Sequence, residues 1–136
     1  MNEVELSNKI KDFFTKKKYT VITEAPLLTK RIDLLCYKKG LFKNKMVAIE
    51  VKVSHWNKAL TQAIIYKLGT DQVYIAIWHQ FIHRVKKEEL KKFGIGLIEI
   101  NGKAIVRLKP RKLKKIQFDI QNNLIGLFEK KKVGIN

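Results

Sequence analysis

Aliphatic and charged residues alternate along residues 45–53, and the alternation predicts a β-strand. Every second residue from Val47 to Val53 is aliphatic, whereas Glu50 and Lys52 occupy intervening positions. Successive side chains of a strand point to opposite faces of its sheet, so Glu50 and Lys52 share one face. An acid and a base therefore lie two residues apart inside an apolar run, which calls for a structural or chemical reason.

Hydrophobic periodicity predicts the remaining elements. Apolar residues at helical spacing indicate a helix over residues 3–17, and Asn2 with Glu5 suits a capping box at its start. Further strands are predicted at 19–23, 31–37 and 71–79, further helices at 55–69, 84–94 and 115–132, and a hairpin at 95–109. Asn101 and Gly102 mark the hairpin turn, and Pro26 places residues 24–30 in a loop or bend.

The order of these elements predicts an α/β fold. Three strands with short connections favour an antiparallel meander, and helix 55–69 then returns the chain to a fourth, parallel strand. The expected fold class is a mixed central β-sheet flanked by helices, with a C-terminal hairpin and helix. No repeat or linker divides residues 1–136, so we expect a single domain with a core at 3–78 and an extension at 79–136.

The chain is strongly basic, with 29 Lys and Arg against 12 Asp and Glu and a formal charge of +17. Such a charge favours nucleic acid as the partner, and an anionic membrane less so. No apolar run approaches the roughly 18 residues of a spanning helix, and residues 1–14 do not resemble a secretion signal. Cys36 is the single cysteine, which excludes an internal disulfide. We expect an intracellular protein, cytoplasmic or nucleoid-associated.

Asp33 is a second carboxylate within a predicted apolar strand. A buried carboxylate without a partner is costly, so Asp33 should have a partner or a metal ion. If strands 31–37 and 45–53 form a hairpin, Asp33 and Glu50 can lie opposite each other. Their oxygens, a main-chain carbonyl and waters would form the oxygen-only site that Mg²⁺ prefers. Lys52 beside it could hold a water or offset the charge of a phosphorane-like transition state.

Gln62 and Tyr66 lie four residues apart, and therefore on one face of the predicted helix 55–69. Both side chains can form hydrogen bonds with a phosphate or a base edge. The pair alone is also typical of an ordinary helix surface.

Together these residues resemble the PD-(D/E)XK nuclease superfamily, and specifically its RecB-like and Holliday-junction-resolvase-like members. Asp33 in "RID" matches the first acid, "EVK" at 50–52 matches the E-x-K element, and "QAIIY" at 62–66 matches the Q-x-x-x-Y helix. The likeness covers the predicted core, and Ile32 stands where the motif name has proline. It implies a restriction-endonuclease-like αβββαβ core.

The resemblance also implies an activity, namely Mg²⁺- or Mn²⁺-dependent hydrolysis of DNA by a structure-directed or weakly specific endonuclease. It assigns metal binding to Asp33, Glu50 and the Val51 carbonyl, the orientation of water to Lys52, and the positioning of DNA to Gln62 and Tyr66. Two other functions stay open at this point. One is a non-catalytic nucleic-acid-binding module of the same fold, and the other is a catalytic subunit that needs a partner.

Family members often add a glutamate from the first helix. Glu3 is the expected residue because it shares the helical face of Leu6 and Ile10, whereas Glu5 suits the capping box. Glu24, after the first predicted strand, is an alternative third acid.

Basic residues outside the motifs are the expected DNA contacts. They are Lys58, Lys109, Arg111, Lys112, Lys114 and Lys115. Junction resolvases act as dimers, because two strands must be cut symmetrically. A homodimer is therefore a further expectation. The apolar helix at 115–132 could supply its dimer face, or could instead cover the sheet.

Overall fold

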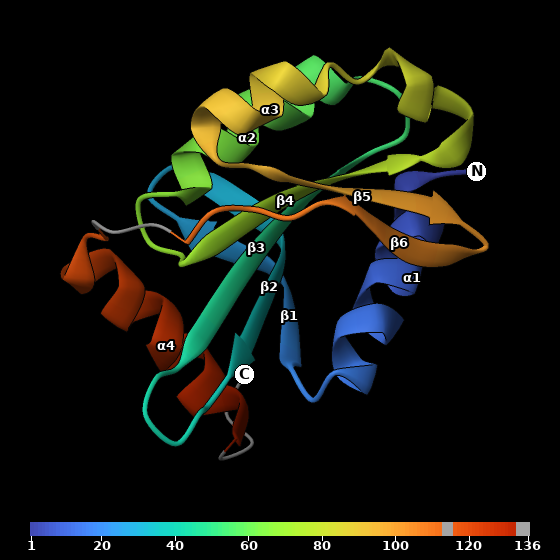
Figure 1. Cartoon of the computed structure of the whole chain (residues 1–136). Helices are drawn as coiled ribbons and strands as arrows, with labels where there is room; N and C mark the ends of the chain where they lie inside the picture. The colour runs from blue at the N-terminus through green and yellow to red at the C-terminus, as the bar shows by residue number, and fades with distance from the viewer. Residues whose placement is uncertain (113–115, 133–136) are drawn as a thin grey trace.

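The computed structural model describes residues 1–112 and 116–132, and in them one six-stranded sheet is flanked by helices (Figure 1). The helices are α1 (Glu3–Lys16), α2 (Trp56–Tyr66), the short 3₁₀ helix η1 (His79–Arg84), α3 (Lys87–Phe93) and α4 (Phe118–Lys132). The strands are β1 (Thr20–Leu27), β2 (Lys30–Lys38), β3 (Lys45–Lys52), β4 (Gln72–Trp78), β5 (Gly96–Asn101) and β6 (Lys103–Leu108).

The sheet is mixed, and its strands lie in chain order from β1 to β6. β1, β2 and β3 form an antiparallel meander, β3, β4 and β5 are parallel, and β6 returns antiparallel to β5. The predicted meander, parallel fourth strand and mixed sheet are therefore confirmed. The C-terminal hairpin is also confirmed, and Gly102 at its turn has the positive φ of 71° that glycine adopts readily.

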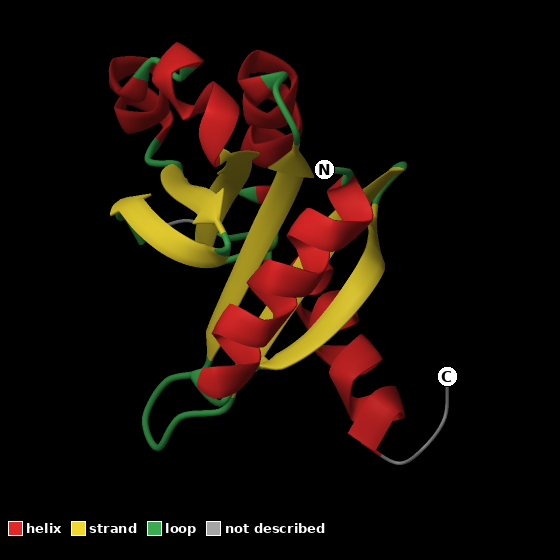
Figure 2. Ribbon diagram, turned by 90° about the vertical axis from the view of Figure 1, so that its right-hand side faces the viewer, coloured by secondary structure: helices red, strands yellow, loops and turns green. Residues whose placement is uncertain are grey.

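Helices cover the two faces of the sheet unequally. α1 packs Leu6 and Ile10 against the face that carries Ile49 and Val51. Figure 2 shows this helix, which begins at the N-terminus, lying across one face of the sheet. α2, α3 and α4 bury apolar residues against the opposite face, which is the face of Glu50. Alternate side chains of β3 therefore belong to two different hydrophobic cores, one on each face of the sheet.

β1 is longer than predicted, and the expected loop at 24–30 was wrong. The strand continues through Pro26 to Leu27, and a two-residue turn that contains Leu28 leads into β2. Proline lacks an N–H group but is tolerated at the edge of a sheet, where β1 lies. Glu24 interrupts the regular backbone with a φ of 57°.

Local signals at the helix ends behaved as expected. The Asn2 side chain accepts a hydrogen bond from the Glu5 N–H at 2.9 Å, which caps α1. Gly94 ends α3 in the left-handed conformation.

Cys36 is fully buried, and burial raises the pKa of its thiol.

α4 uses its apolar residues within the chain. Leu124 and Phe128 are buried in the same core as α2, so the face expected to form a dimer covers the sheet instead. No helix in residues 1–112 and 116–132 is long and apolar enough to cross a membrane.

Candidate active site

The ends of β2 and β3 bring Asp33 and Glu50 together. Leu34 pairs with Ile49, and the next positions along this register are Asp33 and Glu50. Asp33 Oδ2 accepts a hydrogen bond of 2.8 Å from the Val51 N–H. The aspartate therefore lies across the strand pair from Glu50, held by the main chain of β3.

Glu50 is the buried member of this group, with an exposed fraction of 4%. The Tyr66 hydroxyl, presented by α2, lies 2.5 Å from Glu50 Oε1. Lys52 Nζ lies 3.9 Å from Glu50 Oε2, and its side chain is 29% exposed. Lys52 therefore lies between the buried Glu50 carboxyl group and the solvent.

Burial raises the pKa of Glu50 from 4.5 to about 8. The hydrogen bond from Tyr66 lowers the pKa of Glu50, whereas the negative charge of Asp33 and a hydrogen bond with its carboxylate raise it, and the Lys52 ammonium lowers it. Glu50 is therefore mostly protonated at neutral pH in the absence of a cation. Protonation removes the charge repulsion that the sequence implied between the two acids.

The proton of Tyr66 has two acceptors within reach. Its hydroxyl lies 2.8 Å from the Arg31 carbonyl oxygen as well as 2.5 Å from Glu50. A hydroxyl has a single proton, so Tyr66 donates to one of these two oxygens at a time. Protonated Glu50 has its own acceptor in the Asp33 carboxylate, with which its side chain forms a hydrogen bond. Burial raises the pKa of Tyr66, so the phenol keeps its proton throughout.

Tyr66→Phe is expected to destabilise the protein by about 1–2 kcal/mol, because the Arg31 carbonyl and Glu50 lose a partner. The pKa of Glu50 should rise further, since Tyr66 favours the ionised form. Chemical denaturation at several pH values measures both effects. Tyr74→Phe, on the other face of the sheet, is the matched control and should change stability less. Equal losses in the two variants would mean that the Tyr66 hydroxyl has no special role.

Tyr66 and Gln62 are placed differently by α2. Tyr66 is 1% exposed and its hydroxyl is engaged within the protein, so its position suits holding Glu50 rather than contacting DNA. Gln62 lies one turn earlier, is partly exposed, and forms no hydrogen bond with Asp33, Glu50 or Lys52.

None of the three candidate glutamates joins the pair. Glu3 is exposed at the start of α1, the helix that covers the opposite face. Glu5 is engaged in the cap of α1. Glu24 lies on β1 next to the position of Asp33 but is exposed. In the described part of the chain, no group of three or more His, Cys, Asp and Glu side chains could hold a metal ion.

The donor set that remains is Asp33, Glu50 and the Val51 main chain. Two carboxylates and a carbonyl suit Mg²⁺, which uses few protein ligands and keeps several waters. A metal ligand must be deprotonated, so occupation of such a site would release the proton of Glu50.

The predicted DNA contacts lie on the surface where the structure describes them. Lys58 is exposed in the first turn of α2, and Lys109 and Lys112 are exposed after β6. Arg111 donates a hydrogen bond from Nη2 to the Lys92 carbonyl at 3.2 Å, which fixes its side chain against α3. Lys114 and Lys115 fall outside the described residues.

The Arg31 carbonyl is the site group that sequence reasoning missed. Its role depends on the hydroxyl of Tyr66, which lies 35 positions away in the chain. A main-chain oxygen has no signature in the sequence, so only the fold could reveal it.

Comparison with known proteins adds a fold but no activity. No protein-family model matches the chain, and no curated protein matches it. The solved structure of a protein of unknown function from Silicibacter pomeroyi is similar, with 16% sequence identity and a TM-score of 0.71. The match covers 98% of this chain and 88% of that protein. At this identity the likeness shows a shared fold alone.

Proposed function

We propose that this protein is a metal-dependent endonuclease that hydrolyses DNA phosphodiester bonds. The observation that carries the proposal is the position of Asp33 and Glu50 across neighbouring strands, with Lys52 beside Glu50. The element order from α1 to β4, with β3 parallel to β4, supports a restriction-endonuclease-like core of the PD-(D/E)XK kind.

Each residue of the site has a chemical role in this proposal. Asp33, ionised Glu50 and the Val51 carbonyl would hold Mg²⁺ or Mn²⁺. The metal would polarise the phosphate and favour ionisation of a nearby water. Lys52 orients the attacking water and offsets negative charge as it develops. Tyr66 holds Glu50 in place, and Gln62, one turn earlier on the same helix, is partly exposed and can meet the DNA.

Cleavage of a labelled DNA panel tests the proposal. Single strand, duplex, flap and four-way junction are incubated with Mg²⁺, with Mn²⁺ and with EDTA. We expect cutting in either metal and none in EDTA, and the preferred substrate defines the kind of endonuclease. Tight binding without cutting in either metal would contradict the nuclease and favour a binding module or a subunit that needs a partner.

DNA binding is expected to weaken steeply with salt, because lysine and arginine side chains release counterions from the phosphates. The affinity should fall by roughly one power of salt concentration for each phosphate contacted. Fluorescence anisotropy between about 50 and 200 mM salt measures the slope, on the order of 1,000-fold for six contacts.

A double variant tests which lysines are responsible. Lys109→Gln with Lys112→Gln should reduce the slope by about two if both residues contact phosphates. An affinity that does not change with salt would show that the basic surface has another purpose.

A further inference from the structure

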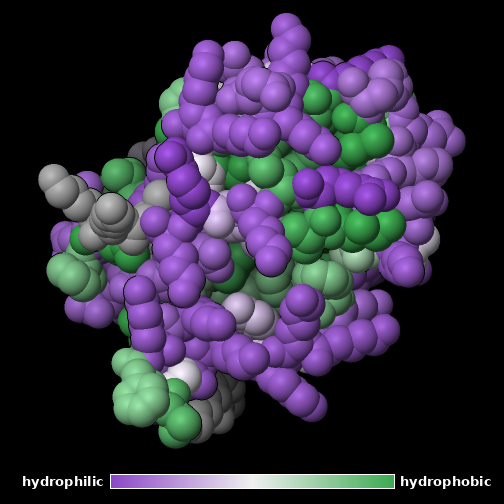
Figure 3. Space-filling model, viewed as in Figure 1, coloured by the Kyte–Doolittle hydropathy of each residue, from purple (hydrophilic) through white to green (hydrophobic). Residues whose placement is uncertain are grey.

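The loop between β2 and β3 exposes two large hydrophobic side chains. Leu41 is 97% exposed and Phe42 is fully exposed, more than the other large apolar residues in the described part of the chain. The loop projects beyond the lower end of the sheet in Figure 1. Figure 3 shows hydrophobic side chains extending there from a surface that is mostly hydrophilic. Adjacent exposed hydrophobic side chains on a hydrophilic surface are typical of an interaction site.

The loop is built to present these residues. A Cβ on Gly40 would lie 2.2 Å from the Lys43 carbonyl oxygen, so the turn closes too tightly for any other residue. Its base is fixed by Asp71, which accepts a hydrogen bond from the Met46 N–H at 2.8 Å and donates one to the Met46 carbonyl at 3.0 Å. Leu41 and Phe42 are therefore held at the tip of an anchored turn.

The charges around the tip favour a polyanionic partner. Lysines occupy positions 38, 39, 43 and 45, and residues 38–45 contain no acid. Asp71 lines a hollow together with Phe42 and Lys43, but its carboxylate is engaged by the Met46 N–H. A second copy of a chain with a formal charge of +17 would bring lysines against lysines, which disfavours self-association through this loop. Nucleic acid combines what the loop needs, phosphates for the lysines and base faces for an aromatic ring.

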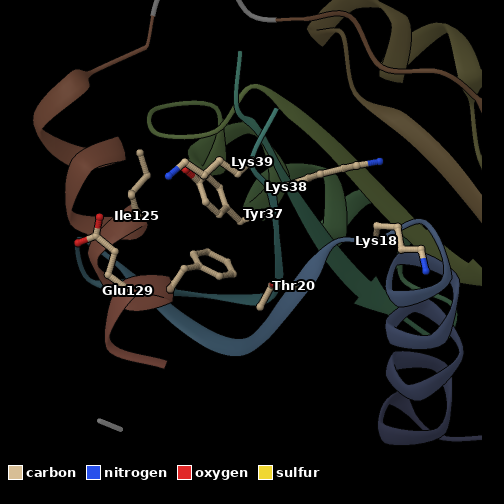
Figure 4. Close-up of a pocket in the computed structure, with 8 residues that line it drawn as sticks. Lys18, Thr20, Tyr37, Lys38, Lys39, Ile125 and Glu129 are labelled. Carbon is tan, nitrogen blue, oxygen red and sulfur yellow. The ribbon is translucent and has the colours of Figure 1, made fainter. Parts of the chain in front are cut away.

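A hollow beside the loop offers further room for a polynucleotide. It has a volume of about 590 Å³ and lies between β2 and α4. Tyr37 and Phe128 form part of it, with ring centroids 5.0 Å apart. Its charged lining consists of three lysines and one acid, namely Lys18, Lys38, Lys39 and Glu129 (Figure 4). Lys39 belongs to both the hollow and the loop, so the sugar-phosphate backbone of one polynucleotide could contact both.

We propose that the loop at residues 39–44 is a stacking wedge, in which Phe42 stacks on an unpaired or unstacked base while Lys39 and Lys43 contact the flanking phosphates. This proposal rests on the proposed function in taking DNA as the substrate. It defines the substrate class as DNA with accessible bases, such as a branched or single-stranded substrate. At strand rise, Lys45 and Glu50 are about 17 Å apart, which is about five nucleotides at the 3.4 Å rise along one strand of duplex DNA.

Binding in EDTA tests the wedge separately from cleavage. The probes are a four-way junction, a single strand and an intact duplex, each with 2-aminopurine at a series of positions. Phe42→Ala should weaken binding of the junction and single strand by about 10-fold or more, and of the duplex by less than about 3-fold. Quenching of 2-aminopurine by the wild-type protein should be lost in the variant.

Conservative variants separate stacking from simple apolar contact. Phe42→Tyr and Phe42→Trp should retain affinity, whereas Phe42→Leu should behave like the alanine variant. Val4→Ala, which shortens another exposed apolar side chain, is the control and should bind normally. Thermal melting confirms that each variant is folded.

Four results would overturn the wedge. They are unchanged DNA affinity in Phe42→Ala, full affinity in Phe42→Leu, Phe42-dependent binding to phosphatidylserine vesicles with DNA binding unaffected, or a dimer that Phe42→Ala dissociates. The wedge can fail while metal-dependent cleavage persists, and it can hold in a protein that does not cut. The two proposals are therefore tested independently.

Discussion

Asp33→Asn is expected to reduce DNA cleavage by at least about 1,000-fold, which corresponds to about 4 kcal/mol of transition-state stabilisation. The amide of asparagine keeps an oxygen that can accept the Val51 N–H, so the junction of β2 and β3 should stay folded. It loses the negative charge that a divalent cation needs. Binding of DNA should be unchanged or slightly tighter, because a negative charge near the phosphates is removed.

Asp12→Asn is the matched control. Asp12 is an exposed acid on α1, so the substitution makes the same change in net charge away from the site. Cleavage is measured under single-turnover conditions, and binding is measured by anisotropy in EDTA. Full cleavage by Asp33→Asn would remove this residue from the site. Loss of both cleavage and binding would instead indicate a defect in folding or in DNA contact.

The fold was predictable because its signals are local. The apolar alternation in β3 assigned Glu50 and Lys52 to one face, and the short connections indicated the meander. Pro26 led to the wrong prediction of a loop at 24–30, because whether a strand tolerates proline depends on where that strand lies in the sheet. A proline excludes a central strand, but β1 is at the edge, and that position is a property of the whole sheet.

The candidate site was predictable to the level of strand pairing. Asp33 and Glu50 lie across from each other because of the register in which β2 pairs with β3, and the two strands are close together in the sequence. The protonation of Glu50 could not be predicted, because it depends on how completely α2 buries the carboxyl group. The position of Glu3 could not be predicted either, since periodicity along α1 does not reveal which face of the sheet the helix covers.

Glu50→Gln is expected to stabilise the metal-free protein by about 3 kcal/mol at pH 7. Burial raises the pKa of Glu50 to about 8 in the folded state, against an ordinary value of 4.5. Between these values the folded protein holds a proton that the unfolded chain releases. The free energy of unfolding therefore falls as pH rises from about 4.5, and the fall ends near pH 8. Glutamine resembles protonated glutamic acid in shape and does not titrate, so the variant escapes this loss.

Denaturant unfolding between pH 4 and pH 9 in EDTA measures the difference, which should be near zero at the acid end and grow with pH. Glu88→Gln removes an exposed acid of α3 and should stay within about 0.5 kcal/mol of the wild type throughout.

Adding Mg²⁺ should then stabilise the wild type and not Glu50→Gln, because only an ionised carboxylate adds to the binding free energy. A Glu50→Gln variant that is less stable than the wild type at pH 7 would contradict the expected gain from removing the titration of Glu50. An equal effect of Mg²⁺ on both proteins would place the cation elsewhere. The combination we expect, a gain in stability together with loss of the Mg²⁺ response, is typical of a carboxylate kept for metal binding at the expense of stability.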